Sequence, residues 1–223
     1  MPKDGEYDDE GTWICISMAA ESRLVISHVV GKRSQNSADR LVKRTDQCLK
    51  ALPLFVTDGL KFYKIALLKQ YGKLQRFAQT GKRGRPRFPR LVSDELLKYA
   101  QIIKQRAGRV LTKVEKRVIF GENIDPKMIS TSYIERQNLT CRQDNYRISR
   151  KTIGFSKRED ELDCQMTLYF ANFNFCRKHR SLKYKDESGI TKLDCPAKQA
   201  GLIDHLWSLQ ELLTFPYHKI QTY

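Results

Sequence analysis

Short apolar runs rich in β-branched residues alternate with stretches of helical spacing, and this alternation constrains the fold more than any other feature. Residues 13–18 (WICISM) and 24–30 (LVISHVV) flank a polar AAESR segment and predict an antiparallel hairpin buried on both faces. A third run, LPLFVTDG, ends in the Thr57-Asp58-Gly59 turn. After the hairpin, N-caps at 34–37 precede a stripe at helical spacing that consists of Ala38, Leu41, Val42, Thr45 and Leu49. After the third run, a second such stripe consists of Leu60, Tyr63, Leu67 and Tyr71. The order predicts an α/β fold with Asp58 at a strand's carboxyl end.

The positive charge of the chain is concentrated in its middle. The net charge is +16, and residues 61–157 hold 24 Lys and Arg against 7 Asp and Glu. Residues 1–60 hold 8 against 9, and residues 158–223 hold 9 against 9. A concentrated basic block is typical of a polyanion partner, most often nucleic acid, and the alternative is a basic protein without such a partner. RNA binding is disfavoured because no aromatic-rich strand signature occurs.

Membrane and secreted proteins are disfavoured by the sequence. No apolar run approaches the roughly 20 residues that span a bilayer, and the acidic start MPKDGEYDDEG does not resemble a secretory signal. The 6 cysteines are scattered without a CxxC pair, which favours reduced thiols, most of them in the core. We therefore expect a cytoplasmic, nucleoid-associated protein without membrane contact.

The basic block opens with a loop and continues as a hairpin. Residues 73–90 hold 7 basic residues and no acidic one, with Gly and Pro breakers. Within them, KRGRPR has the Arg-Gly-Arg-Pro core of an AT-hook, which lies in the A·T minor groove. The alternative is a linker that binds phosphates without sequence preference. In both cases the DNA-binding residues are Lys82, Arg83, Arg85 and Arg87. Alternation over 98–106 and 110–120 then predicts a basic β-hairpin inserted in the core.

Two helices are predicted after the hairpin. From residue 133 the spacing places Glu135, Asn138, Arg142 and Tyr146 on one polar face. The last clear helix begins at Ser156 with a capping box to Glu159, and its apolar stripe consists of Leu162, Met166, Tyr169, Phe170 and Phe173. This stripe is expected to close the core.

Asp58 and Glu135 are the carboxylates that suggest chemistry. One acid at a strand end and one on a polar helix face can hold a pair of Mg²⁺ ions for phosphoryl transfer on a nucleic acid. The competing interpretation of Asp58 is a turn or cap residue before Gly59.

Four segments occur in this order over about residues 12–184: VVGKRSQNSADRL, LPLFVTDGLKFYKIALLKQYG, STSYIERQNLTCRQDNYRISRKTIGFSK and YFANFNFCRKHRSL. Together they closely resemble the catalytic domain of DDE transposases of the insertion-element-one type. The resemblance implies a ribonuclease-H-like mixed sheet flanked by helices, and metal-dependent DNA strand cleavage and transfer during transposition of an insertion sequence. It also implies two Mg²⁺ or Mn²⁺ ions, double-stranded DNA at element ends and target as partner, and a homo-oligomer in the DNA complex.

The resemblance assigns roles to individual residues. Asp58 matches the second catalytic, metal-binding acid and Glu135 the third. The residues that would support the site and contact the DNA backbone are Asn138, Arg142, Arg150, Lys151 and Thr152. His179 matches a terminal Arg-x-His element, with Lys178 where proline is usual.

The start of the chain departs from the family pattern. The first acid belongs to an Asp-Glu-x-Trp word on the first strand, whereas Lys3 to Gly11 lack apolar alternation. We therefore expect 1–11 to be an acidic linker and the first strand to be absent. The expected organisation is a core of 12–72 and 128–184, a basic insertion at 73–127 and a tail at 185–223. The alternative to a transposase core is a catalytically inactive DNA-binding remnant.

Overall fold

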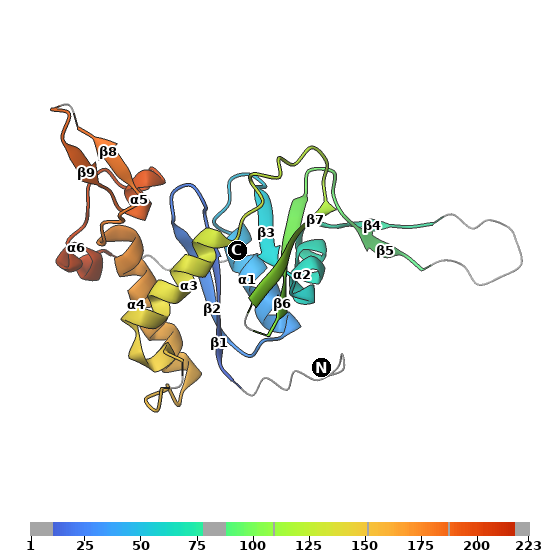
Figure 1. Cartoon of the computed structure of the whole chain (residues 1–223), viewed down its shortest axis with the longest axis horizontal. Coiled ribbons are helices and arrows are strands. Elements are labelled where there is room, and N and C mark those ends of the chain that lie inside the picture. The colour runs from blue at the N-terminus through green and yellow to red at the C-terminus, as the bar shows by residue number, and fades with distance from the viewer. Residues whose placement is uncertain (1–10, 78–87, 109, 151, 187, 217–223) are drawn as a thin grey trace, which may run out of the picture. The chain divides into compact units, whose positions relative to one another are not determined.

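The computed structural model describes residues 11–77, 88–108, 110–150, 152–186 and 188–216 (Figure 1). The chain forms two compact units, the first built from 1–15 with 29–145 and the second from 16–28 with 146–223. The predicted mixed α/β fold is confirmed at this level. Within the described ranges, no helix has the length and apolar character needed to cross a membrane.

The first unit is built on a sheet of order β3-β6-β7, comprising β3 (Leu54–Asp58), β6 (Lys98–Ala107) and β7 (Val110–Phe120). β3 and β6 run parallel, whereas β6 and β7 form the antiparallel hairpin that alternation predicted. The hairpin is therefore part of the same sheet as β3. The parallel pair joins segments that lie about forty residues apart in the sequence.

Each face of this sheet has its own apolar cluster. On one face, α1 (Gln35–Asp46) and α2 (Lys61–Tyr71) contact each other (Figure 1). Their cluster consists of Ala38, Val42, Ala66, Leu67, Leu97 and Tyr99, with Phe55 packed against it. The other face carries Ala100, Ile102 and Ile129, with Val56 packed against them. Neighbouring residues of β3 therefore point to opposite faces, as strand geometry requires.

Two further strand pairs occur in the chain, one before β3 and one between β3 and β6. β1 (Trp13–Met18) pairs with β2 (Val25–Gly31), which confirms the first hairpin, although Trp13 is exposed rather than buried. β4 (Lys73–Gln75) pairs antiparallel with β5 (Arg90–Val92), so the ends of the segment predicted as a loop are strands. The AT-hook-like sequence at 82–87 and the acidic start at 1–10 lie outside the described residues.

The second unit is centred on α4 (Glu159–Phe175), whose predicted apolar residues are largely buried. The predicted capping box is wrong, because the N-cap is Arg158 without a side-chain cap and the Ser156 hydroxyl donates to the Arg158 carbonyl. Near the end of α4, the buried Asn174 amide accepts from the Val25 N–H at 3.0 Å and donates to the Val25 carbonyl at 2.8 Å. These two bonds attach β2 to α4.

The expected tail contains regular structure of its own. β8 (Lys183–Lys185) pairs with β9 (Thr191–Leu193), and α5 (Pro196–Gln199) and α6 (Leu209–Thr214) follow. α6 has a capping box between Ser208 and Glu211. All six cysteines are free thiols, but only Cys141 and Cys195 are buried, so the prediction that most lie in the core is wrong.

Candidate functional site: two carboxylates at one end of the central sheet

Asp58 is the last residue of β3, and its side chain is exposed. Its Oδ1 accepts the backbone N–H of Leu60, the N-cap of α2, at 3.1 Å. Asp58 therefore does have the turn role that its position before Gly59 suggests. One Oδ1 contact of this kind leaves the second carboxylate oxygen available for a further partner.

A hydrogen-bonded chain supports the backbone of Asp58 from within the sheet. The Thr57 hydroxyl donates to the Asp58 carbonyl at 2.8 Å and lies 2.8 Å from the Tyr99 hydroxyl. The buried Gln101 amide donates to the same Tyr99 hydroxyl at 2.8 Å. Tyr99 is completely buried, so each polar atom of this chain depends on its neighbour for a partner.

The charge of Asp58 affects two half-buried groups, Cys15 and Tyr63. Burial raises the pKa of the Cys15 thiol, and a Tyr63 hydrogen bond only partly offsets this effect. Burial also raises the pKa of the Tyr63 phenol, and the charges of Cys15 and Asp58 raise it further. Both groups are therefore neutral at pH 7.

Glu135 lies in the first turn of α3 (Ser132–Asp144), where the helix dipole favours a carboxylate. Its Oε1 accepts from the Thr131 hydroxyl at 2.6 Å. The Lys104 ammonium donates to both carboxylate oxygens, and the contact to Oε2 is 2.5 Å. Burial alone would raise the pKa of Glu135, but Lys104, Thr131 and the nearby charge of Arg106 together lower it. Glu135 is therefore ionised at pH 7.

The strand register and the alternation of side chains place Asp58 and Lys104, the partner of Glu135, on the same face of the sheet. Asp58 pairs with Ile102, and Lys104, which holds Glu135, is two residues further along β6. Residues two apart on a strand share a face and lie about 7 Å apart. Asp58 and Glu135, separated by 77 positions in the sequence, thus flank one short stretch of β6.

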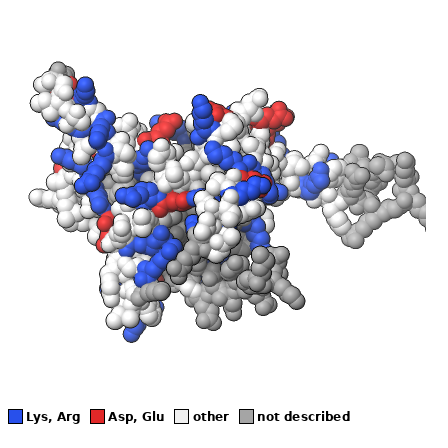
Figure 2. Space-filling model, viewed as in Figure 1, with Lys and Arg blue, Asp and Glu red and all other residues white. Residues whose placement is uncertain are grey.

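Basic side chains accompany the carboxylates on the same hairpin. The segment 98–120 contains seven Lys and Arg and a single Glu. Lys104 and Arg106 follow Ile102 on the Glu135 side, and Lys116, which pairs with Ile102, shares that side. Figure 2 shows Lys and Arg covering more of the visible surface than Asp and Glu do. The sequence prediction did not single out Lys104, because a lone lysine in a basic block has no distinguishing pattern.

The other predicted site residues are spread more widely. Asn138 and Arg142 lie half-buried on α3, one and two turns after Glu135. The polar face does not continue to Tyr146, which begins a separate 3₁₀ turn (Tyr146–Ile148), and this part of the helix prediction is wrong. Arg150 is exposed in the second unit. The candidates outside the described residues are Lys82, Arg83, Arg85, Arg87 and Lys151.

His179 has a structural environment within the second unit. Its Nδ1 lies 2.8 Å from the Ser181 hydroxyl, and its ring packs edge-on against Phe173. Burial lowers the pKa of the imidazole, and the charges of Arg23 and Arg177 lower it further. The ring is therefore neutral at pH 7 and is suited to positioning the 179–181 turn.

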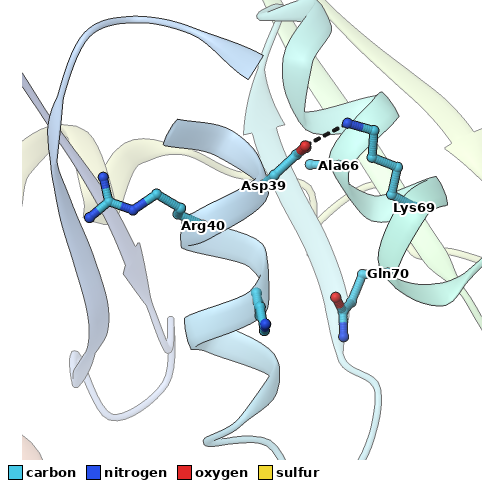
Figure 3. Close-up of a pocket in the computed structure, with 6 residues that line it drawn as sticks. Asp39, Arg40, Ala66, Lys69 and Gln70 are labelled. Atoms are coloured by element: carbon cyan, nitrogen blue, oxygen red, sulfur yellow. Dashed lines mark hydrogen bonds and ion pairs between the residues drawn. The ribbon is translucent and has the colours of Figure 1, made fainter. Parts of the chain in front are cut away.

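A shallow pocket between α1 and α2 is distinct from the carboxylates. It is lined by Asp39, Arg40, Lys43, Ala66, Lys69 and Gln70 (Figure 3). The Lys69 ammonium lies 2.5 Å from Oδ2 of Asp39, so the one acid of the pocket is already paired. Neither Asp58 nor Glu135 lines it.

The described residues do not fit the two-metal site that the resemblance implies. Such a site takes several carboxylate oxygens around two cations. In the described part of the chain, no three His, Cys, Asp or Glu residues are grouped so as to hold a metal ion. Both oxygens of Glu135 already accept from the Lys104 ammonium group.

Comparisons of the chain with protein-family models, with curated proteins and with solved structures found no match.

Proposed function

We propose that this chain is the ribonuclease-H-like domain of a DDE-type DNA transposase, with Asp58 and Glu135 as two of its three catalytic acids. The observation that carries the proposal is the register of β3 against β6, which supports a shared location for two acids far apart in the sequence.

The electrostatics around the carboxylates favour DNA as the substrate. Phosphodiesters are polyanions, and Lys104, Arg106 and Lys116 present cations on the side of the sheet where Glu135 lies. In this proposal the basic hairpin binds the DNA backbone and brings a phosphate to the carboxylates. Strand cleavage and transfer would additionally need a third acid and divalent cations.

A catalytically silent DNA-binding protein is the second candidate. The observation that favours it is the Lys104 to Glu135 pair, which neutralises one of the two acids. In this case the same surface binds DNA but does not cut it. The two candidates differ in what happens when a third acid is supplied.

The decisive experiment supplies that acid. An amino-terminal strand with the family's Asp-Glu-x-Trp word is fused to the chain, and strand transfer on element-end DNA is measured with Mg²⁺ or Mn²⁺. The transposase proposal predicts that the protein without the fused strand binds DNA without nicking it and that the fused protein transfers strands.

The control variants separate the site from the rest of the surface. Asp58→Ala and Glu135→Ala are expected to abolish transfer by the fused protein, whereas exposed Glu122→Ala is expected to leave it unchanged. Transfer that survives both site substitutions would contradict the assignment. DNA binding without transfer in every fused protein would favour the silent candidate.

A further inference from the structure

The environment of Glu135 suggests a second role for Lys104, besides its place among the cations of the basic hairpin. Lys104 donates to both oxygens of Glu135, and these are the atoms that would ligate a cation. Thr131 occupies a further lone pair of Oε1 at 2.6 Å. An ammonium group in this position supplies the positive charge that a carboxylate at a metal site otherwise obtains from the ion.

Lys104 is also placed to contact a phosphate. Its side chain is about one third exposed, and it extends from a strand whose next residue on the same face is Arg106. Two cations spaced along one strand edge can bind successive phosphates of a DNA backbone. Lys104 therefore has two possible anionic partners, a carboxylate within the chain and a phosphate outside it.

We infer that Lys104 takes the place of a metal ion beside Glu135. In the free chain its ammonium group keeps divalent ions away from the Glu135 carboxylate. When DNA binds, the ammonium group leaves the carboxylate and contacts a phosphate. The inference rests on the proposed function for the identity of the phosphate. It makes Lys104 a positioning residue that acts through Glu135. It accounts for one part of the disagreement with a two-metal site, because Lys104 donates to both oxygens that would ligate a cation.

The first test is Mn²⁺ binding to the full chain, measured by titration calorimetry without DNA. Lys104→Gln removes the competing charge and is expected to tighten Mn²⁺ binding about fivefold, since a partly exposed ion pair is worth up to about 1 kcal/mol. Lys104→Arg keeps the charge and is expected to resemble the wild type. Lys113→Gln, on the opposite face of the hairpin, is the matched control and should have no effect.

Glu135→Gln in the Lys104→Gln background assigns the effect to the carboxylate, because the gain in Mn²⁺ affinity should then disappear. Mn²⁺ affinity that is unchanged or weaker in Lys104→Gln would overturn the inference, as would a gain that persists without Glu135. A lysine that only stabilises the fold would change the free energy of unfolding but would not tighten Mn²⁺ binding.

The second test is the salt dependence of duplex DNA binding. Lys104→Gln removes one phosphate contact, so it should flatten the slope of log K against log salt by about 0.9. Glu135→Gln keeps that contact and should leave the slope unchanged, but it should tighten duplex binding at fixed salt because Lys104 no longer has to leave a carboxylate. An unchanged slope in Lys104→Gln, or a slope changed by Glu135→Gln, would overturn the inference. Neither test involves strand transfer, so a failure of the proposed catalytic function is distinguishable from a failure of this inference.

Discussion

The hydrogen-bonded chain beneath Asp58 allows a quantitative prediction. Tyr99→Phe removes one hydroxyl that is completely buried and lies 2.8 Å from both Thr57 Oγ1 and Gln101 Nε2. The ring stays, so packing against the helices is preserved. The loss is two hydrogen bonds, and the buried Gln101 amide is left without its acceptor, which together cost about 2 kcal/mol of unfolding free energy.

The assay is urea unfolding followed by circular dichroism, with the midpoint compared at constant slope. Thr57→Val removes only the hydroxyl at the end of this hydrogen-bonded series and is expected to lower the free energy of unfolding by about 1 kcal/mol. The double variant should lose less than the sum of the two single losses, because Thr57 and Tyr99 share a hydrogen bond. Tyr184→Phe is the control, since Tyr184 is a partly exposed residue of β8 and should stay within about 0.5 kcal/mol of the wild type.

A Tyr99→Phe variant as stable as the control would refute the stabilising role of these hydrogen bonds. Removing a hydrogen-bonded, buried hydroxyl lowers the free energy of unfolding when its partners stay buried. Additive effects of Thr57→Val and Tyr99→Phe would show that the two hydroxyls do not act as one network.

Three more predictions concern charge and packing. Because the basic block dominates the charge, it is expected to neutralise about five phosphates, which gives a slope of about −4.5 in log K against log salt. Replacing Arg83, Arg85 and Arg87 with Ala should flatten this slope. Loss of the preference for A·T-rich duplex in that variant would indicate an AT-hook. The pKa of Glu135 is lowered in the fold from the usual value of 4.5. The stability from its ion pair is therefore fully present above pH 4.5 and is lost as the pH falls through the pKa of the folded state. In carbon NMR titrations, Lys104→Gln should raise the pKa of Glu135. Asn174→Ala leaves Val25 backbone groups unpaired and should cost about 1 to 3 kcal/mol in urea unfolding, whereas exposed Asn36→Ala should cost little.

Periodicity predicted the elements of the sheet because each strand and helix has its own local pattern. β1, β2, β3, β6 and β7 all have branched or aromatic residues in runs or alternation, and Ser34, the N-cap of α1, lies within the predicted cap region. The pairing of the strands could not be predicted in this way, because no local sequence pattern indicates that β3 lies beside β6 in parallel. That contact depends on which apolar surfaces fit together in three dimensions, and it decides where Asp58 and Glu135 lie.

The errors have identifiable physical causes. The polar face after Glu135 stopped at Arg142 because Asn145 adopts an extended conformation and ends α3 before Tyr146. The capping box at Ser156 failed because its hydroxyl bonds to the carbonyl of Arg158 instead of to a helix N–H. β4 and β5 are three residues each and exposed, so they are too short for alternation to be visible.

The central claim is that DNA binds to the face of the hairpin that carries Lys104 beside Glu135. Val114 pairs with Lys104 on this face, and its neighbour Lys113 pairs with Gln105 on the other. Both positions are exposed, so each tolerates a photo-crosslinking amino acid, and each variant is irradiated with duplex DNA at low salt. We predict strong crosslinking from position 114 and little from position 113. Crosslinking that is equal at the two positions, or confined to position 113, would contradict the account.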